Sequence, residues 1–164
     1  MKRLRLLALL AALAAPPAAV ALAVGDAAPP LAVPDGEGQQ VDLVRLRGSV
    51  VYVDFWASWC GPCKRSFPWM NELSRKYAAS GLKIVAINLD KKREDAERFL
   101  KVSPAEFTVA YDATGTSPAA WQVKSMPSSY LVDATGRIAW VESGFKDDRK
   151  PEVEARIRAA LAAK

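Results

Sequence analysis

The feature that most constrains the fold is an apolar strand followed almost at once by two cysteines. Residues 50–56 are β-branched or aromatic apart from one carboxylate, Asp54, and they have the length of a strand buried on both faces. Cys60 and Cys63 follow, and apolar residues then recur with helical spacing at Phe67, Met70, Leu73 and Tyr77. The sequence therefore predicts that both cysteines lie in the first turn of a helix that follows a buried strand.

The rest of the pattern predicts an α/β fold. Strand, helix, strand and helix alternate at first, which is typical of crossover units, and a short turn at residues 133–136 then forces an antiparallel strand pair. The predicted elements are strands at 82–89, 107–111, 129–132 and 137–142, helices at 93–102 and from Pro151 onward, and an N-terminal β-hairpin within 26–48, with extended stretches at 31–33 and 40–46. We expect a central mixed β-sheet flanked by helices, with the hairpin as an extension.

The first residues have the pattern of an export signal. Lys2, Arg3 and Arg5 precede an uncharged stretch, and Ala21-Leu22-Ala23 has the small-residue spacing of a cleavage site. Residues 1–23 are predicted to be a signal peptide and residues 24–164 a single domain. The alternative is an uncleaved membrane anchor through residues 6–24. Either interpretation predicts a periplasmic domain, anchored to the inner membrane in the second case.

Charge and composition exclude several classes of function. Removing the predicted signal lowers the formal charge from +5 to +2, because the segment holds three basic residues and no acid. No basic stretch with interleaved aromatic residues remains, so nucleic-acid binding is not expected. Histidine is absent, which excludes Ser-His-Asp and Cys-His nucleophile systems and His-ligated metal sites.

A C-x-x-C pair can be half of a zinc site, a structural disulfide or a redox-active pair. A structural zinc takes four Cys or His ligands and this chain offers two, so no metal is expected. A structural disulfide that closes so short a loop stabilises a fold by only about 2 kcal/mol in the chain-entropy model. The redox interpretation also explains the position, because the start of a helix favours the thiolate form of Cys60. Cys60 is predicted to attack a disulfide, and Cys63 to resolve the mixed disulfide that results.

Asp54, on the preceding strand, is the nearest ionisable candidate for taking the proton of Cys63. A carboxyl buried without a cation has a raised pKa, which suits a base that takes the proton of Cys63 near neutral pH. The alternative is a carboxylate that is satisfied by the backbone or by water and has no role in the reaction.

These residues resemble a known family. The stretch VDFWASWCGPCK at residues 53–64 resembles the active-site stretch of thioredoxins. The segments VGDAAP at 24–29, LRG at 46–48 and SMPSS at 125–129 resemble the exported, membrane-associated thioredoxins of bacteria, the TlpA-like or redoxin group. The resemblance spans about residues 24–164, the size of a whole domain, and it implies a thioredoxin-like fold and thiol-disulfide oxidoreductase activity.

The resemblance also implies how a partner protein would bind. In that family the proline that matches Pro127 is cis and faces the disulfide, and the backbone of Met126 would pair with an extended partner segment. Trp59 would be an exposed aromatic residue beside the site, and Trp59, Gly61, Pro62, Met126 and Pro127 are the expected substrate-binding residues. The other interpretation of Met126 is core filling.

Three positions depart from the family pattern. Thioredoxins commonly pair the buried Asp with a lysine on the next strand, where this chain has Ala86. Many exported members carry Asn where this chain has Asp54. Cytochrome-maturation members often carry an acid where this chain has Ser66, which makes dedicated reduction of apocytochrome c less favoured.

The Gly61-Pro62 centre resembles reducing members of the superfamily, whose potentials lie near about −270 mV, against about −120 mV for the strongly oxidising periplasmic enzyme. A protein-disulfide reductase in an oxidising compartment must be recharged, which implies a membrane-bound electron donor. We expect protein disulfides as substrates, no cofactor and a monomer. The alternatives are Cu(I) handling by the two thiolates or a factor for cytochrome c maturation. A peroxidase and a non-catalytic binding module are less favoured.

Overall fold

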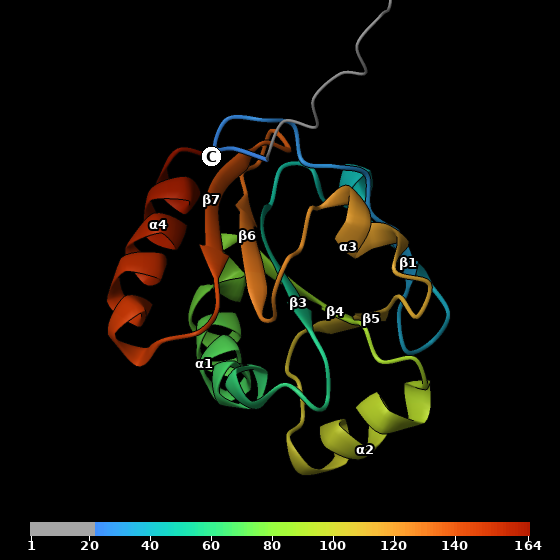
Figure 1. The fold of residues 1–164 in the computed structure, drawn as a ribbon. Helices are drawn as coiled ribbons and strands as arrows, with labels where there is room; N and C mark the ends of the chain where they lie inside the picture. Colours follow the sequence, from blue (N-terminus) through green and yellow to red (C-terminus); the bar gives the residue numbers. More distant parts are fainter. Residues whose placement is uncertain (1–21) are drawn as a thin grey trace, which may run out of the picture.

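Five strands form one mixed sheet in the order β5-β4-β3-β6-β7 (Figure 1). The computed structural model describes residues 22–164, so most of the predicted signal segment lies outside the described residues. The strands of this sheet are β3 (Val50–Trp56), β4 (Leu82–Asn88), β5 (Thr108–Tyr111), β6 (Ser128–Val132) and β7 (Ile138–Ser143). The central strand, β3, is buried along its whole length, as its run of β-branched and aromatic residues predicts.

The strand directions confirm the predicted mixed sheet. β3 pairs in parallel with β4, and β4 with β5, whereas β3–β6 and β6–β7 are antiparallel. The turn between β6 and β7 contains Gly136, whose φ of 85° lies in the left-handed region that favours glycine. This arrangement places Asp54 of β3 between Ala86 of β4 and Ser129 of β6.

The longer helices cover one face of the sheet, and the N-terminal segment and the short third helix lie on the other (Figure 1). The helices are α1 (Gly61–Tyr77), α2 (Arg93–Val102), α3 (Thr116–Ala120) and α4 (Lys150–Ala162). Apolar residues of α1, α2 and α4 pack in one core with Tyr52 and Trp56. A second core on the opposite face joins Leu31 and Val33 of the N-terminal segment to Phe55 and to Trp121, which follows α3. The sheet therefore separates two apolar layers, and the cysteines belong to the helical one.

The N-terminal hairpin is present but shorter than predicted. β1 (Ala32–Pro34) pairs antiparallel with β2 (Gln40–Asp42), whereas the predicted extended stretch continued to Leu46. Residues Leu43–Leu46 instead form a 3-10 turn, which begins where the Asp42 side chain accepts a hydrogen bond from the backbone N–H of Val44. Helix α3 was not predicted, because five residues are too few to show helical periodicity. Within residues 22–164, no helix is long and apolar enough to cross a membrane.

Candidate active site

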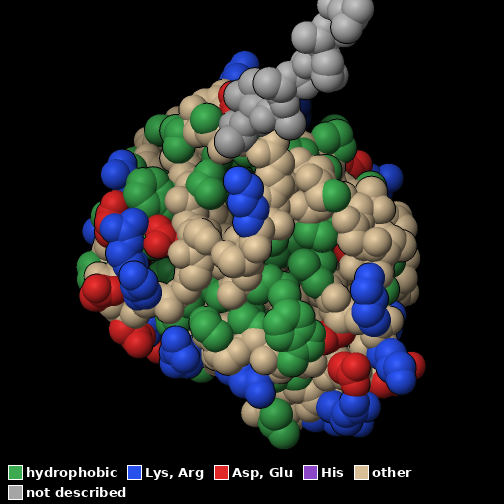
Figure 2. Space-filling model, in the orientation of Figure 1, with side chains coloured by type: hydrophobic (Ala, Val, Ile, Leu, Met, Phe, Trp, Pro, Cys, Tyr) green, Lys and Arg blue, Asp and Glu red, His purple; other side chains and the backbone are tan. Residues whose placement is uncertain are grey.

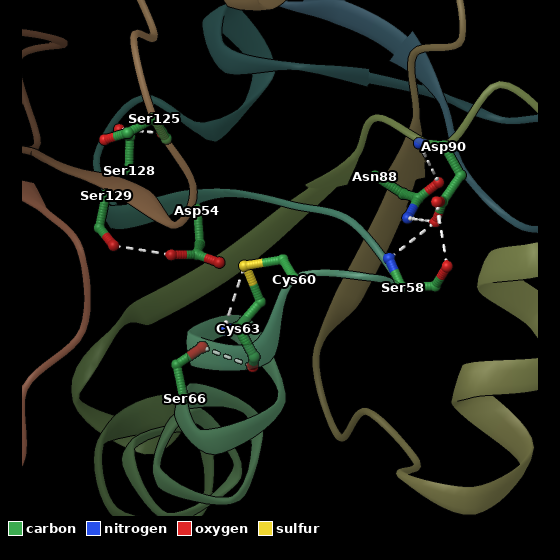
Figure 3. The surroundings of a disulfide bond; sticks show 10 residues. All are labelled: Asp54, Ser58, Cys60, Cys63, Ser66, Asn88, Asp90, Ser125, Ser128 and Ser129. Carbon is green, nitrogen blue, oxygen red and sulfur yellow. Dashed lines mark hydrogen bonds between the residues drawn. A yellow bond between two sulfur atoms is a disulfide. The ribbon is translucent and has the colours of Figure 1, made fainter.

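Cys60 and Cys63 lie at the start of α1, as predicted, and they form a disulfide. Cys60 is the residue that caps the helix, and its Sγ accepts a hydrogen bond from the backbone N–H of Cys63 at 3.2 Å (Figure 3). Cys60 is 5% exposed and Cys63 is 0% exposed. The first sulfur therefore lies at the surface edge of the pair and the second lies beneath it. The backbone N–H of Cys63 points at the first sulfur, where it would stabilise a thiolate.

A buried carboxylate fixes the loop that leads into the cysteines. Asp90, just after β4, accepts hydrogen bonds from the backbone N–H of Ser58 at 2.9 Å and from its hydroxyl at 3.0 Å. The side chain of Asn88 donates to Asp90 at 2.7 Å. These contacts, drawn in Figure 3, join the end of β4 to the residues before Cys60. No local sequence pattern indicates them, because they depend on β3 and β4 being neighbours.

Asp54 lies on β3 behind the disulfide and is 1% exposed. Its Oδ1 accepts a hydrogen bond from the hydroxyl of Ser129 at 2.7 Å, whereas Oδ2 is buried and has no hydrogen-bond partner in residues 22–164. Burial raises the pKa of Asp54 to about 7, although the hydrogen bond from Ser129 opposes that rise. The raised pKa agrees with the expectation for a carboxyl buried without a cation.

Ser66 occupies the place on α1 where the family resemblance leads one to look for an acid. Its side chain is buried, and its hydroxyl donates to the backbone carbonyl of Cys63 at 2.9 Å. The hydroxyl therefore completes a local helix contact and brings no charge to the cysteines.

A groove of about 520 Å³ opens beside the disulfide. Trp59, Gly61, Pro62 and Met126, four of the five predicted substrate-binding residues, line it together with Cys60. The fifth, Pro127, is buried and does not line the groove, and the Met126–Pro127 peptide bond is cis, as the resemblance implies. Trp59 is 70% exposed. Figure 2 shows an apolar area over the ends of β3 and β6, bordered by Lys and Arg side chains.

Several residues of the groove were not predicted. They are Leu89, Pro118, Val123, Lys124 and Ser125. Leu89 follows β4, and the other four belong to the segment from α3 to the cis-proline, which has no regular pattern in the sequence. Among the described residues, no group of three or more Cys, Asp or Glu side chains is arranged to hold a metal ion.

Comparisons with known proteins agree with this geometry. The Redoxin family matches residues 23–157. A thiol-disulfide oxidoreductase ResA of Bacillus cereus is 33% identical over 135 residues, which cover 82% of this chain and 77% of that protein. ResA of Geobacillus thermodenitrificans is 33% identical over 137 residues, with 82% and 79% coverage.

Solved structures extend the likeness to the fold. A putative thiol:disulfide interchange protein DsbE from Chlorobium tepidum has a TM-score of 0.83 and 50% identity, covering 86% of this chain and 99% of that one. A putative protein disulfide isomerase from Bacteroides thetaiotaomicron, 24% identical with a TM-score of 0.79 and coverages of 86% and 91%, shares the fold. The chain therefore belongs to the Redoxin family of the thioredoxin superfamily and is a thiol-disulfide oxidoreductase of the protein-disulfide reductase type.

Proposed function

We propose that the chain reduces disulfides of other proteins outside the cytoplasm, with Cys60 as the nucleophile, Cys63 as the resolving cysteine and Asp54 as the base. The observation that carries this proposal is the unequal placement of the two sulfurs. One lies at the surface edge at the start of α1, beside an apolar groove, and the other is fully buried beneath it.

In the first step the reduced enzyme acts through the thiolate of Cys60. Its Sγ attacks one sulfur of the partner's disulfide, a new S–S bond joins Cys60 to the partner, and the other partner sulfur leaves as a thiolate. The backbone N–H of Cys63, which points at Sγ of Cys60, and the positive end of the α1 dipole stabilise the anion before the attack. The exchange takes place between the enzyme and its partner alone, so this step needs no other oxidant or reductant.

In the second step Cys63 releases the partner. Its thiol gives a proton to Oδ2 of Asp54, and the resulting thiolate attacks Sγ of Cys60. The bond between Cys60 and the partner breaks, and the second partner sulfur leaves as a thiolate. Two electrons have then passed to the partner, and the enzyme holds the Cys60–Cys63 disulfide that the structure describes.

The groove supports an extended partner segment beside Cys60. Met126 and Trp59 offer apolar surface along it, beside Cys60. A partner strand would add its main chain to that of Met126 and place its cystine over Cys60. Specificity for particular partner proteins would then come from those partner side chains that fit the groove.

The proposal includes the compartment and the source of electrons. Residues 1–23 act as the export signal, or residues 6–24 as a tether, and residues 24–164 form the periplasmic domain. A membrane-bound donor reduces the Cys60–Cys63 disulfide after each turnover, because an oxidising compartment supplies no reductant of its own. The enzyme works as a monomer and without a cofactor.

Trapping tests the proposed function. A Cys63→Ser variant cannot resolve the mixed disulfide, so it should retain its natural client on Cys60, whereas the matched Cys60→Ser variant should retain none. Mass spectrometry identifies the client, and an apocytochrome c among the trapped proteins would favour a role in cytochrome c maturation. Equal trapping by both variants, or by neither, would contradict the assignment of Cys60 as nucleophile.

A further inference from the structure

A row of side chains crosses the sheet through Asp54. The neighbour of Asp54 on β4 is Ala86, its neighbour on β6 is Ser129, and the neighbour of Ser129 on β7 is Glu142. Residues directly opposite one another in neighbouring strands project on the same face of a sheet. Ser129 is therefore the only one of the two strand neighbours of Asp54 that carries a hydrogen-bonding side chain.

The two oxygens of Asp54 have different surroundings. Oδ1 accepts the hydroxyl of Ser129 at 2.7 Å, and Oδ2 has no partner among the described residues. In Figure 3 the partnered oxygen is turned toward Ser129 on β6 and the other toward the sulfurs of Cys60 and Cys63. A carboxylate held by one oxygen cannot rotate freely, so its other oxygen keeps a fixed direction.

We infer that Ser129 is a positioning residue of the reaction: its hydroxyl holds Oδ1 of Asp54, so that Oδ2 stays the open acceptor for the proton of Cys63. This inference rests on the proposed role of Asp54 as base. The bond also favours the charged form of the carboxyl, because a hydroxyl donates to a carboxylate more strongly than to a neutral acid. Ser129 thus supplies part of the stabilisation that a cation would supply at the position of Ala86.

The groups that face Asp54 are few. On β3, Tyr52 lies two residues earlier on the same face, and its pKa is raised first by burial and then by the charge of Asp54, while the hydroxyl of Ser129 opposes the rise. On α1 the facing groups are Cys63 and Cys60. On β7, Glu142 lies beyond Ser129 in the row and pairs with Arg149 at 3.0 Å. Ala86 on β4 does not titrate, so Ser129 is the group whose removal should act most directly on the carboxyl.

The experiment is a titration of Asp54 by carbon NMR in the oxidised full-length chain. Disulfide-bonded cysteines do not titrate, so the carboxyl is observed without them. Ser129→Ala should raise the pKa of Asp54 by about 1 unit or more above its starting value near 7. Ser129→Thr keeps a hydroxyl and should leave the pKa within a few tenths of a unit of the wild-type value.

Ser128→Ala is the matched control. Ser128 is also buried on β6, but its hydroxyl donates to the carbonyl of Ser125 at 2.7 Å and not to Asp54, as Figure 3 shows. This variant should leave the pKa of Asp54 unchanged. If Ser129→Ala shifts the pKa no more than Ser128→Ala does, the inference is overturned, whatever the enzyme's activity.

A second readout connects the titration to the reaction. The rate of resolution of a mixed disulfide on Cys60 should rise with pH, and Ser129→Ala should move that rise upward by the same amount as the pKa of Asp54. A pKa shift with an unmoved rate profile would also overturn the inference. Because the titration needs no exchange chemistry, a failure of the proposed function would appear separately, as an absence of exchange in the wild-type protein.

Discussion

Asp54 and Asp112 both expose little side-chain surface, but Asp54 lies deeper in the protein and accepts fewer hydrogen bonds. Asp112 accepts five hydrogen bonds from Thr114, Gly115 and Ser117, and these outweigh burial and lower its pKa to about 2. Asp54 accepts one, and burial raises its pKa to about 7. Burial raises the pKa of both carboxyls, but Asp112 lies less deep and its donors outweigh that effect, so its charge is held, whereas Asp54 can accept a proton near neutral pH.

The comparison separates a structural carboxylate from a reactive one. Asp112 lies after β5 and fixes the turn that leads into α3. Asp54 lies behind the disulfide and leaves one oxygen without a partner in residues 22–164. A fully satisfied carboxylate stabilises the fold, whereas a half-satisfied one destabilises it and is retained where its proton is used.

The largest expected effect is on the rate of the reaction. Asp54→Asn should slow resolution of a mixed disulfide on Cys60 by about 100-fold or more at pH 7, because general base catalysis contributes about 10²- to 10⁴-fold. Rapid-quench measurement of client release checks it. Asp112→Asn serves as the control and should change this rate less than about twofold. Equal losses in the two variants would remove the distinction between the two carboxylates.

The next effect is on stability. Asp112→Ala should lower the free energy of unfolding by about 3 kcal/mol at pH 7, because the buried backbone N–H and hydroxyl of Ser117 lose their acceptor. Chemical denaturation followed by circular dichroism measures this change. A loss below about 1 kcal/mol would show that Asp112 does not hold the turn.

For Asp54 the effect on stability has the opposite sign. Its folded pKa of about 7 lies above the ordinary value of 3.8, so between these values the folded state binds the proton and the unfolded state does not, and stability falls as pH rises. At about 1.4 kcal/mol per unit the full cost approaches about 4 kcal/mol, and Asp54→Asn should recover about 2 kcal/mol at pH 8, since its amide is also buried. Denaturation at pH 8 and at pH 4 checks it, because little gain is expected at pH 4.

The smallest expected effect is the loss of folding stability at low pH that follows from protonation of Asp112. Its pKa is lowered, so its contribution to stability is complete above about pH 4 and is lost as pH falls toward about 2. The wild-type protein should therefore lose about 1 kcal/mol more than Asp112→Asn between pH 4 and pH 2, a figure reduced for solvent screening. Parallel unfolding curves for the two proteins over this range would contradict the lowered pKa.

Local patterns predicted the centre of the molecule well. The run of β3 and the helical spacing after Cys63 placed the cysteines correctly, because both signals lie within one contiguous stretch. The partners of Asp54 and Asp90 were not predictable in the same way. Ser129 reaches Asp54 from the neighbouring strand, and Ser58 reaches Asp90 from the loop after β3, so both contacts depend on how the sheet is assembled.

The irregular segments were the least predictable. Residues 43–46 looked extended, yet the Asp42 side chain starts a 3-10 turn there. Lys124 and Val123 line the groove, but they lie in a segment whose path is set by tertiary contacts such as that of Trp121 with Tyr130. Their positions depend on packing and not on local sequence.

Alkylation of the reduced protein tests the central claim most directly. Cys60 is the more exposed cysteine, at the start of α1, and Cys63 is fully buried, so brief treatment with iodoacetamide at pH 7 should modify Cys60 at least about tenfold faster than Cys63. Peptide mass spectrometry assigns the modified residue. Modification of Cys63 first, or of both cysteines at the same rate, would contradict the account.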